Sequence, residues 1–177
     1  MRVIVVLAEG FEEIEAITVV DVLRRAGIEV DMVGIVGTMV SGSHGIRVMA
    51  DKRFGEIKTE GYDGIILPGG DPGYKNLAKT SKILEIIKKM YSEGKIVAAI
   101  CAAPYVLAKA GILEGKKATI YPGMESELQY PRGEKVVVDG NVITSQGPGT
   151  AMEFALAIVE KLVGKEKAYL LRRQLIL

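Results

Sequence analysis

The chain has 177 residues, of which 49% are hydrophobic and 25% charged, and its formal net charge is +1 at pH 7. This length fits one domain over residues 1–177, and the apolar content excludes a disordered protein. The balanced charge gives no basic face for a nucleic acid, and no apolar run reaches the roughly 18 residues that span a bilayer. Because the first residues show no signal-peptide pattern, we expect a cytoplasmic protein.

Strand-like and helix-like segments alternate along the chain. Residues 3–8 form a continuous apolar run, which is typical of a strand buried on both faces of a parallel sheet. A helix is predicted at 12–26, then a strand at 29–36 and a hairpin or bulged element at 40–50. Further strands are predicted at 64–67, 96–100, 117–121, 136–139 and 142–145, and further helices at 81–92, 103–110, 151–163 and 165–174.

Two local signals refine these elements. Ser81 is predicted to cap the helix that follows it, and Asp139-Gly140 predicts a tight hairpin turn. The alternation of elements predicts an α/β fold with a doubly wound, mostly parallel sheet and helices on both faces. In such folds the site lies at the carboxyl ends of the strands, where the loops 9–13, 68–73 and 101–104 fall.

The single cysteine, Cys101, follows a buried strand and precedes a helix. A sharp strand-to-helix turn around a nucleophile needs small residues two positions before and after it, and Ala99 and Ala103 stand there. A thiol at the start of a helix is expected to favour the thiolate. The alternative is a small buried residue at the end of a core strand. One cysteine and one histidine speak against a structural zinc site.

Three acids, Glu12, Glu13 and Glu15, fall in the first turns of the first helix. Only Glu15 shares a stripe with apolar residues, among them Phe11 and Val19. Burial there raises a carboxyl pKa, so Glu15 is the candidate proton donor or acceptor for the thiol. The other two acids fit a simple interaction with the helix dipole.

The remaining candidates are a glycine loop and the lone histidine. Backbone N–H groups of Gly69 and Gly70 are candidates for an oxyanion hole beside Cys101, with a plain turn as the alternative. His44 lies in a glycine-rich hairpin far from Cys101 in sequence, so an exposed loop histidine is the simpler interpretation. No histidine follows Cys101, which excludes a triad built on a downstream histidine.

Several runs occur in a characteristic order: LAEGFEEIE at 7–15, VDVLRRAGI at 20–28, LPGG at 67–70, AAICA at 98–102 and TSQGPGT at 144–150. Together they resemble the ThiJ/PfpI superfamily, in its branch of parkinsonism-linked protein deglycases. The resemblance implies a flavodoxin-like fold, a homodimer and no cofactor or metal. It also implies that Cys101 is the nucleophile, that Glu15 is its protonated partner, and that Gly69, Gly70 and Ala102 line the pocket.

The activities implied by the resemblance are cofactor-independent glyoxalase action on methylglyoxal or glyoxal, and removal of their early adducts from proteins. A redox-sensing chaperone that uses oxidation of Cys101 is the alternative, and an intracellular cysteine peptidase is a further one. Ala102 counts against the peptidase, because that branch has histidine there. Tyr121 stands where the deglycase branch often has histidine, so only a hydroxyl is available. His44 aligns with a residue that approaches the partner subunit's site across the dimer.

Overall fold

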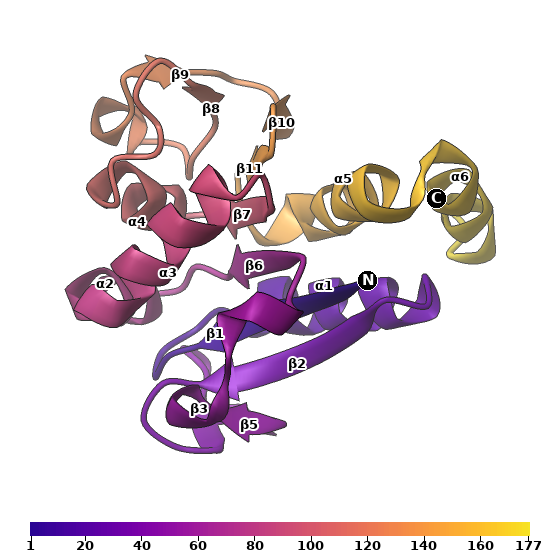
Figure 1. Cartoon of the computed structure of the whole chain (residues 1–177). Coiled ribbons are helices and arrows are strands. Elements are labelled where there is room, and N and C mark those ends of the chain that lie inside the picture. Colours follow the sequence, from indigo (N-terminus) through magenta and orange to yellow (C-terminus); the bar gives the residue numbers. More distant parts are fainter.

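The computed structural model describes all 177 residues, and a seven-stranded sheet forms its centre (Figure 1). The strands are β1 (Arg2–Leu7), β2 (Glu29–Gly34), β5 (Lys52–Arg53), β6 (Gly64–Leu67), β7 (Ile96–Ile100), β10 (Val136–Asp139) and β11 (Val142–Ser145). They lie in the order β10-β11-β7-β6-β1-β2-β5, and only the β10–β11 pair is antiparallel. The five strands from β11 to β2 follow the flavodoxin-like order.

Helices cover both faces of this sheet. One face carries α1 (Glu13–Arg25) and α5 (Ala151–Val163), with α6 (Lys165–Gln174) packed on α5, and the other carries α2 (Gly73–Lys79), α3 (Ser81–Ser92) and α4 (Pro104–Lys109) (Figure 1). None of these helices combines the length and apolar composition that crossing a membrane requires. The predicted fold class, a doubly wound α/β sheet, is confirmed.

Small elements complete the chain. They are the hairpin β3 (Met39–Ser41) and β4 (Arg47–Met49), the pair β8 (Lys117–Ala118) and β9 (Tyr130–Pro131), and the 3-10 turns η1 (Phe54–Glu56), η2 (Thr59–Gly61), η3 (Glu125–Glu127) and η4 (Pro148–Thr150). The hairpin predicted within 40–50 is therefore present, with β3 and β4 paired antiparallel.

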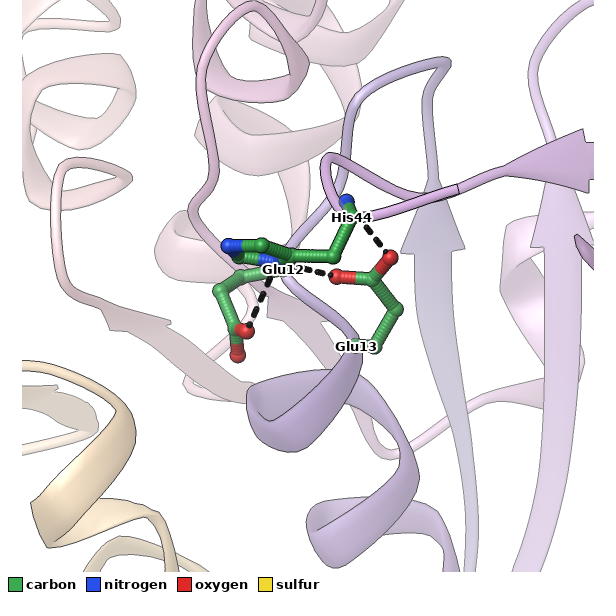
Figure 2. A group of neighbouring side chains, drawn as sticks. All are labelled: Glu12, Glu13 and His44. Atoms are coloured by element: carbon green, nitrogen blue, oxygen red, sulfur yellow. Dashed lines mark hydrogen bonds and ion pairs between the residues drawn. The ribbon is translucent and has the colours of Figure 1, made fainter. Parts of the chain in front are cut away.

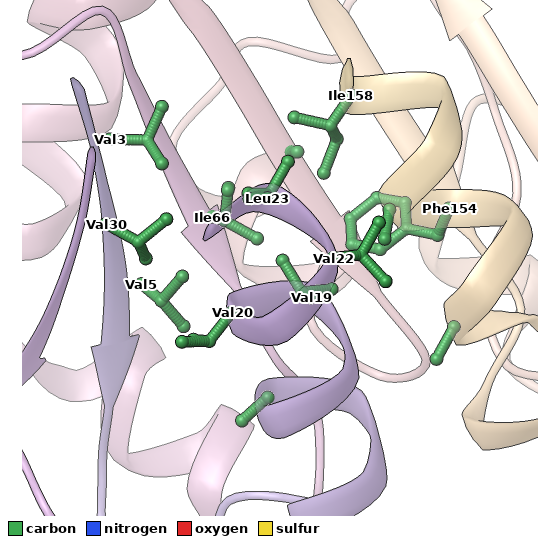
Figure 3. Close-up of a cluster of buried hydrophobic side chains, with 14 of the residues drawn as sticks. Val3, Val5, Val19, Val20, Val22, Leu23, Val30, Ile66, Phe154 and Ile158 are labelled. Carbon is green, nitrogen blue, oxygen red and sulfur yellow. The ribbon is translucent and has the colours of Figure 1, made fainter. Parts of the chain in front are cut away.

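The sheet divides the hydrophobic core into two clusters, one on each of its faces, because strands such as β1 are buried on both faces. Val3 and Val5 of β1 belong to the cluster under α1 and α5, whereas Ile4 belongs to the cluster under α3 and α4. Figure 3 shows the first cluster, in which Phe154 of α5 lies against the side chains of α1. Phe154 has no exposed surface, so removing its ring would leave a cavity at the centre of this layer.

Two sequence predictions need correction, and one helix was missed. Thr80 rather than Ser81 is the cap residue of α3, and its side chain makes no capping hydrogen bond. The strand predicted at 117–121 is only β8, which pairs outside the main sheet because the chain turns from there toward Cys101. The helix α2 was not predicted, because Gly73 at its first position is typical of a loop.

The loops expected at the carboxyl ends of the strands do meet. The Glu12 N–H donates to the Gly69 carbonyl at 3.0 Å, and the Gly73 N–H donates to the Gly10 carbonyl at 3.1 Å. A Cβ at Gly69 would lie 2.7 Å from Cys101 Cβ, so the glycine loop also lies against the cysteine turn. The first helix, the glycine loop and the cysteine turn therefore share one edge of the sheet.

Candidate active site

Cys101 lies in a strained turn directly after β7. Its φ is 63°, in the left-handed region that residues other than glycine seldom adopt. The backbone holds it there, because its N–H donates to the Ser145 carbonyl at 3.0 Å and its carbonyl accepts from Tyr121. Strain of this kind, about 1–3 kcal/mol, persists where surrounding structure fixes it and is concentrated at functional sites.

Glu15 is fully buried on the apolar side of α1, where the helical stripe predicts it. Its Oε2 accepts the Gly69 N–H at 2.7 Å, and its Oε1 is buried without a hydrogen-bond partner. The carboxyl group interacts with the Cys101 thiol. An unpartnered buried carboxyl oxygen beside a thiol is suited to proton transfer, since no other donor competes for it.

The glycine loop, residues 68–73, contributes backbone N–H groups to both Glu15 and Cys101. The Gly69 N–H is engaged by Glu15, so it is not free to bind a substrate oxygen, contrary to the expectation for this residue. The backbone N–H groups of Gly70 and Ala102 instead face the Cys101 sulfur and lower the pKa of the thiol. These two donors form the candidate oxyanion site.

The pKa values of the pair are strongly displaced. Burial raises the pKa of Glu15 to about 7, and the negative charge of Glu12 adds to this effect. Burial, followed by the charge of Glu15, raises the pKa of Cys101 to about 12. The predicted free thiolate is therefore corrected, because α4 begins only at Pro104 and the two amides do not offset burial and the Glu15 charge. Near neutrality the pair loses its first proton, and a thiol beside a carboxylate remains.

Within its own chain, the His44 ring lies beside Glu13 and Glu12 (Figure 2). Its ring Nδ1 is 2.9 Å from Glu13 Oε2 and 3.7 Å from Glu12 Oε1. Glu12 in turn accepts the Glu15 N–H at 2.9 Å, as the cap of α1. His44 is thus linked to Glu15 by Glu12 and does not touch Cys101 through any of these contacts.

Glu13 ties the hairpin β3–β4 to the start of α1. Its Oε1 accepts the N–H of His44 at 2.7 Å and that of Ile46 at 3.3 Å, while Oε2 binds the His44 ring. Although burial opposes the charge, these hydrogen bonds lower the pKa of Glu13 to about 2. The ligand atoms of Glu12, Glu13 and His44 lie within 4.8 Å of one another, a spacing that suits a cation, but the hydrogen bonds to Glu13 account for the cluster without one.

A pocket of about 260 Å³ opens beside the thiol. Tyr121 lies on its wall and is half exposed. The lining is Gly70, Asp71, Tyr74, Cys101, Ala102, Tyr121 and Met124. Tyr74 and Met124 were not predicted from the sequence, because their place depends on α2 and on the turn after Tyr121. The burial of Glu12 and Glu13 was also missed, because it depends on the hairpin that closes over them.

Comparisons with known proteins show the family to which this chain belongs. A family model for the DJ-1/PfpI family matches residues 1–161. Protein dj-1beta of Drosophila melanogaster is 44% identical over 169 residues, which cover 93% of this chain and 90% of that protein. A deglycase of Pyrococcus abyssi is 37% identical over 153 residues, covering 84% of this chain and 92% of that protein. Oxidized DJ-1 of Toxoplasma gondii is 38% identical with a TM-score of 0.95, covering 99% of this chain and 97% of that one. The chain belongs to the DJ-1/PfpI family.

Proposed function

We propose that this protein is a cysteine-dependent, cofactor-independent glyoxalase and deglycase that converts α-oxoaldehydes such as methylglyoxal and glyoxal into 2-hydroxy acids. The observation that carries the proposal is the buried Glu15 carboxyl beside the Cys101 thiol, with one carboxyl oxygen free of partners. A nucleophile with a proton carrier beside it is the minimum that this chemistry needs.

The first step joins the thiol to the substrate. The Cys101 sulfur attacks the aldehyde carbon while its proton passes to the Glu15 carboxylate, and the carbonyl electron pair moves to oxygen. The N–H groups of Gly70 and Ala102, which face the sulfur, are placed to stabilise that oxyanion. Return of the proton from Glu15 to oxygen gives a neutral hemithioacetal.

The second step moves hydrogen between two neighbouring carbons. Glu15 removes the proton from the former aldehyde carbon, the electron pair forms an enediolate, and Glu15 returns the proton to the former ketone carbon. The hydroxyl proton reaches the former ketone oxygen through solvent, which leaves a thioester of the hydroxy acid. Water then breaks the carbon–sulfur bond and restores the thiol. One carbon is oxidised as its neighbour is reduced, so the reaction consumes only water.

The same pair suits early aldehyde adducts of proteins, since these carry the same two-carbon unit. The deglycase of Pyrococcus abyssi supports this part of the proposal, because it is similar over most of both chains. The test follows lactate formation from methylglyoxal in the absence of glutathione. Wild type is expected to form lactate and Cys101→Ala to form none above background, whereas equal rates in the two proteins would exclude the mechanism.

Redox sensing is the second candidate function, favoured by the similarity to an oxidized DJ-1 structure. Two equivalents of peroxide would each transfer one oxygen to the Cys101 sulfur and leave as water, giving a sulfinate. Protonated Glu15 and the N–H groups of Gly70 and Ala102 are placed to hold it. Intact mass after mild peroxide should show two added oxygen atoms on wild type and none on Cys101→Ser. The same gain on the serine variant would contradict this role.

A homodimer fits the exposed surface beside the site. Ile14 and Ile17 of α1 are 56% and 41% exposed, and Ile46, whose N–H binds Glu13, is 57% exposed. Apolar side chains gathered at one place favour a partner, here a second copy. Sedimentation of wild type and of Ile17→Glu tests the assembly. A dimer that the variant weakens is expected, and a monomeric wild type would contradict it.

A further inference from the structure

The pocket beside Cys101 is larger and more apolar than a methyl-substituted aldehyde requires. Five of its seven lining residues are hydrophobic, and Asp71 is its only charged member. The volume of about 260 Å³ approaches the roughly 300 Å³ at which ligand pockets usually begin. Methylglyoxal, with its few non-hydrogen atoms, leaves most of that space to water.

The rings of Tyr74 and Tyr121 and the thioether of Met124 form an apolar wall of this pocket, and the two rings are held in place. Tyr74 meets Tyr105 edge to face, with ring centroids 5.9 Å apart and an interplanar angle of 87°. The Tyr121 ring lies over Gly147, since a Cβ at Gly147 would be 3.5 Å from Tyr121 Cδ2. Rings fixed in this way pack on a ligand with little loss of entropy.

Met124 is joined to this wall by the backbone. Its N–H donates to the Tyr121 carbonyl at 3.0 Å, and the Tyr121 N–H donates to the Cys101 carbonyl at 2.8 Å. These two backbone hydrogen bonds therefore fix the positions of Tyr121 and Met124 relative to Cys101. A methionine beside aromatic rings adapts to flat or branched apolar groups.

The position of the reacting atoms determines which part of the substrate lies against Tyr74, Tyr121 and Met124. When the aldehyde carbon is bound to the sulfur and its oxygen faces Gly70 and Ala102, the acyl substituent must occupy the remaining space. Asp71 disfavours an anionic substituent there, although its ion pair with Lys75 at 2.8 Å reduces the repulsion. An uncharged aromatic or bulky apolar substituent fits this lining best.

We infer that Tyr74, Tyr121 and Met124 make this site selective for α-oxoaldehydes with an aromatic or large apolar substituent, such as phenylglyoxal, over methylglyoxal. The inference rests on the proposed function for its reaction and on the pocket for its selectivity. Contact with one aromatic ring contributes about 0.5–1.5 kcal/mol, which corresponds to roughly a two- to thirteenfold preference.

The first measurement compares kcat/KM for phenylglyoxal and methylglyoxal in wild type, Tyr121→Ala, Met124→Ala and Tyr121→Phe. The phenylglyoxal-to-methylglyoxal ratio should fall about two- to thirteenfold in the two alanine variants and stay close to the wild-type value in Tyr121→Phe, which keeps the ring. Tyr169→Ala, which removes an exposed ring on α6, is the matched control and should keep the wild-type ratio.

A second measurement tests the selectivity of the pocket by the rate at which Cys101 is alkylated, without any enzymatic turnover. Cys101 is alkylated by 2-bromoacetophenone or by bromoacetone, so that a carbon–sulfur bond forms, bromide leaves and the thiol proton is lost to Glu15 or solvent. Each rate is divided by the rate at which the same reagent alkylates glutathione, which corrects for the intrinsic reactivity of the reagent. Because Cys101 is the single cysteine, intact mass reports the alkylation of that residue. The phenyl-to-methyl ratio should exceed one in wild type and fall in Tyr121→Ala and Met124→Ala.

The two arms separate the inference from the function on which it rests. Equal alkylation ratios in wild type and both alanine variants would overturn the selectivity. A ratio that falls as expected supports the selectivity even if neither aldehyde yields a hydroxy acid, a result that would reject the proposed reaction alone.

Discussion

The carboxyl group of Glu15 and the thiol of Cys101 meet across Gly69, which has no side chain to separate them. A Cβ at Gly69 would lie 2.7 Å from Cys101 Cβ and 3.0 Å from Glu15 Oε2. The Gly69 N–H also holds the Glu15 carboxyl at 2.7 Å. One glycine thus allows the two groups to lie close together and orients one of them.

Gly69→Ala is expected to force Cys101 and Glu15 apart. A misplacement of about 1 Å at reacting groups costs roughly 100-fold in rate, and overpacking costs about 1–3 kcal/mol of stability. Hydroxy-acid formation and urea unfolding measure the two effects. Gly37→Ala, at a position with open space around it, should alter neither. A fully active Gly69→Ala would show that the close approach is unimportant.

Glu15→Gln is expected to lower kcat for lactate formation by about 10²–10⁴-fold, because the amide cannot accept the thiol proton. Glu15→Asp keeps a carboxyl group on a shorter side chain and should fall between the two. Thermal unfolding of each variant separates loss of chemistry from loss of fold. A glutamine variant as active as wild type would remove Glu15 from the mechanism.

The lowered pKa of Glu13 predicts how the stability of the fold falls at acid pH. Its pKa in the folded protein, about 2, lies below the ordinary value of 4.5, so its contribution is complete above pH 4.5 and is lost as the pH falls through about 2. Glu13→Gln should cost about 1–3 kcal/mol at pH 7, where the hydrogen bonds to the charge are lost, and should flatten the decline in stability between these pH values. Urea unfolding across that range tests it.

The control for this prediction is Glu85→Gln, which removes an exposed acid of α3 and should keep the wild-type pH dependence. If Glu13→Gln and wild type lose stability in parallel between pH 4.5 and 2, the hydrogen bonds from His44 and Ile46 do not stabilise the charge as described.

Phe154→Ala should destabilise the fold by about 3–5 kcal/mol, because the ring is fully buried between α5 and α1 (Figure 3). The lowered midpoint of thermal unfolding measures this cost. Tyr169→Ala, on the exposed side of α6, should stay within about 0.5 kcal/mol of wild type. Similar losses in both would mean that burial does not determine the cost.

Local sequence patterns predict the strands of the sheet and the burial of Glu15, one member of the Glu15–Cys101 pair. Continuous apolar runs such as the one at β1 mark strands buried on both faces, and the helical stripe through Phe11 and Val19 predicts the burial of Glu15. Both predictions depend on one element at a time. They succeed because strand and helix periodicity are fixed by backbone geometry.

Contacts between distant segments were not predictable in this way. The engagement of Gly69 by Glu15 joins residues 54 positions apart, and the bond from Glu13 to His44 spans 31. The pKa of Cys101 was expected to fall because the sequence shows the helix start, whereas the burial and the charge that raise it come from the packed fold. Charge and solvation belong to the assembled site and are not visible in one segment.

The pH dependence of Cys101 alkylation tests most directly whether Cys101 and Glu15 act as one proton-sharing pair. Iodoacetamide rates are measured by intact mass on wild type and Glu15→Gln, in which the single cysteine is the only thiol. Because the pKa of Glu15 is about 7, its carboxylate forms as the pH rises through 7 and can then accept the thiol proton during alkylation, so the wild-type rate should rise there. Glu15→Gln should show no step there and should react only at higher pH, because burial still raises the pKa of the thiol above the free value of about 8.5. The same profile in both proteins would contradict a shared proton.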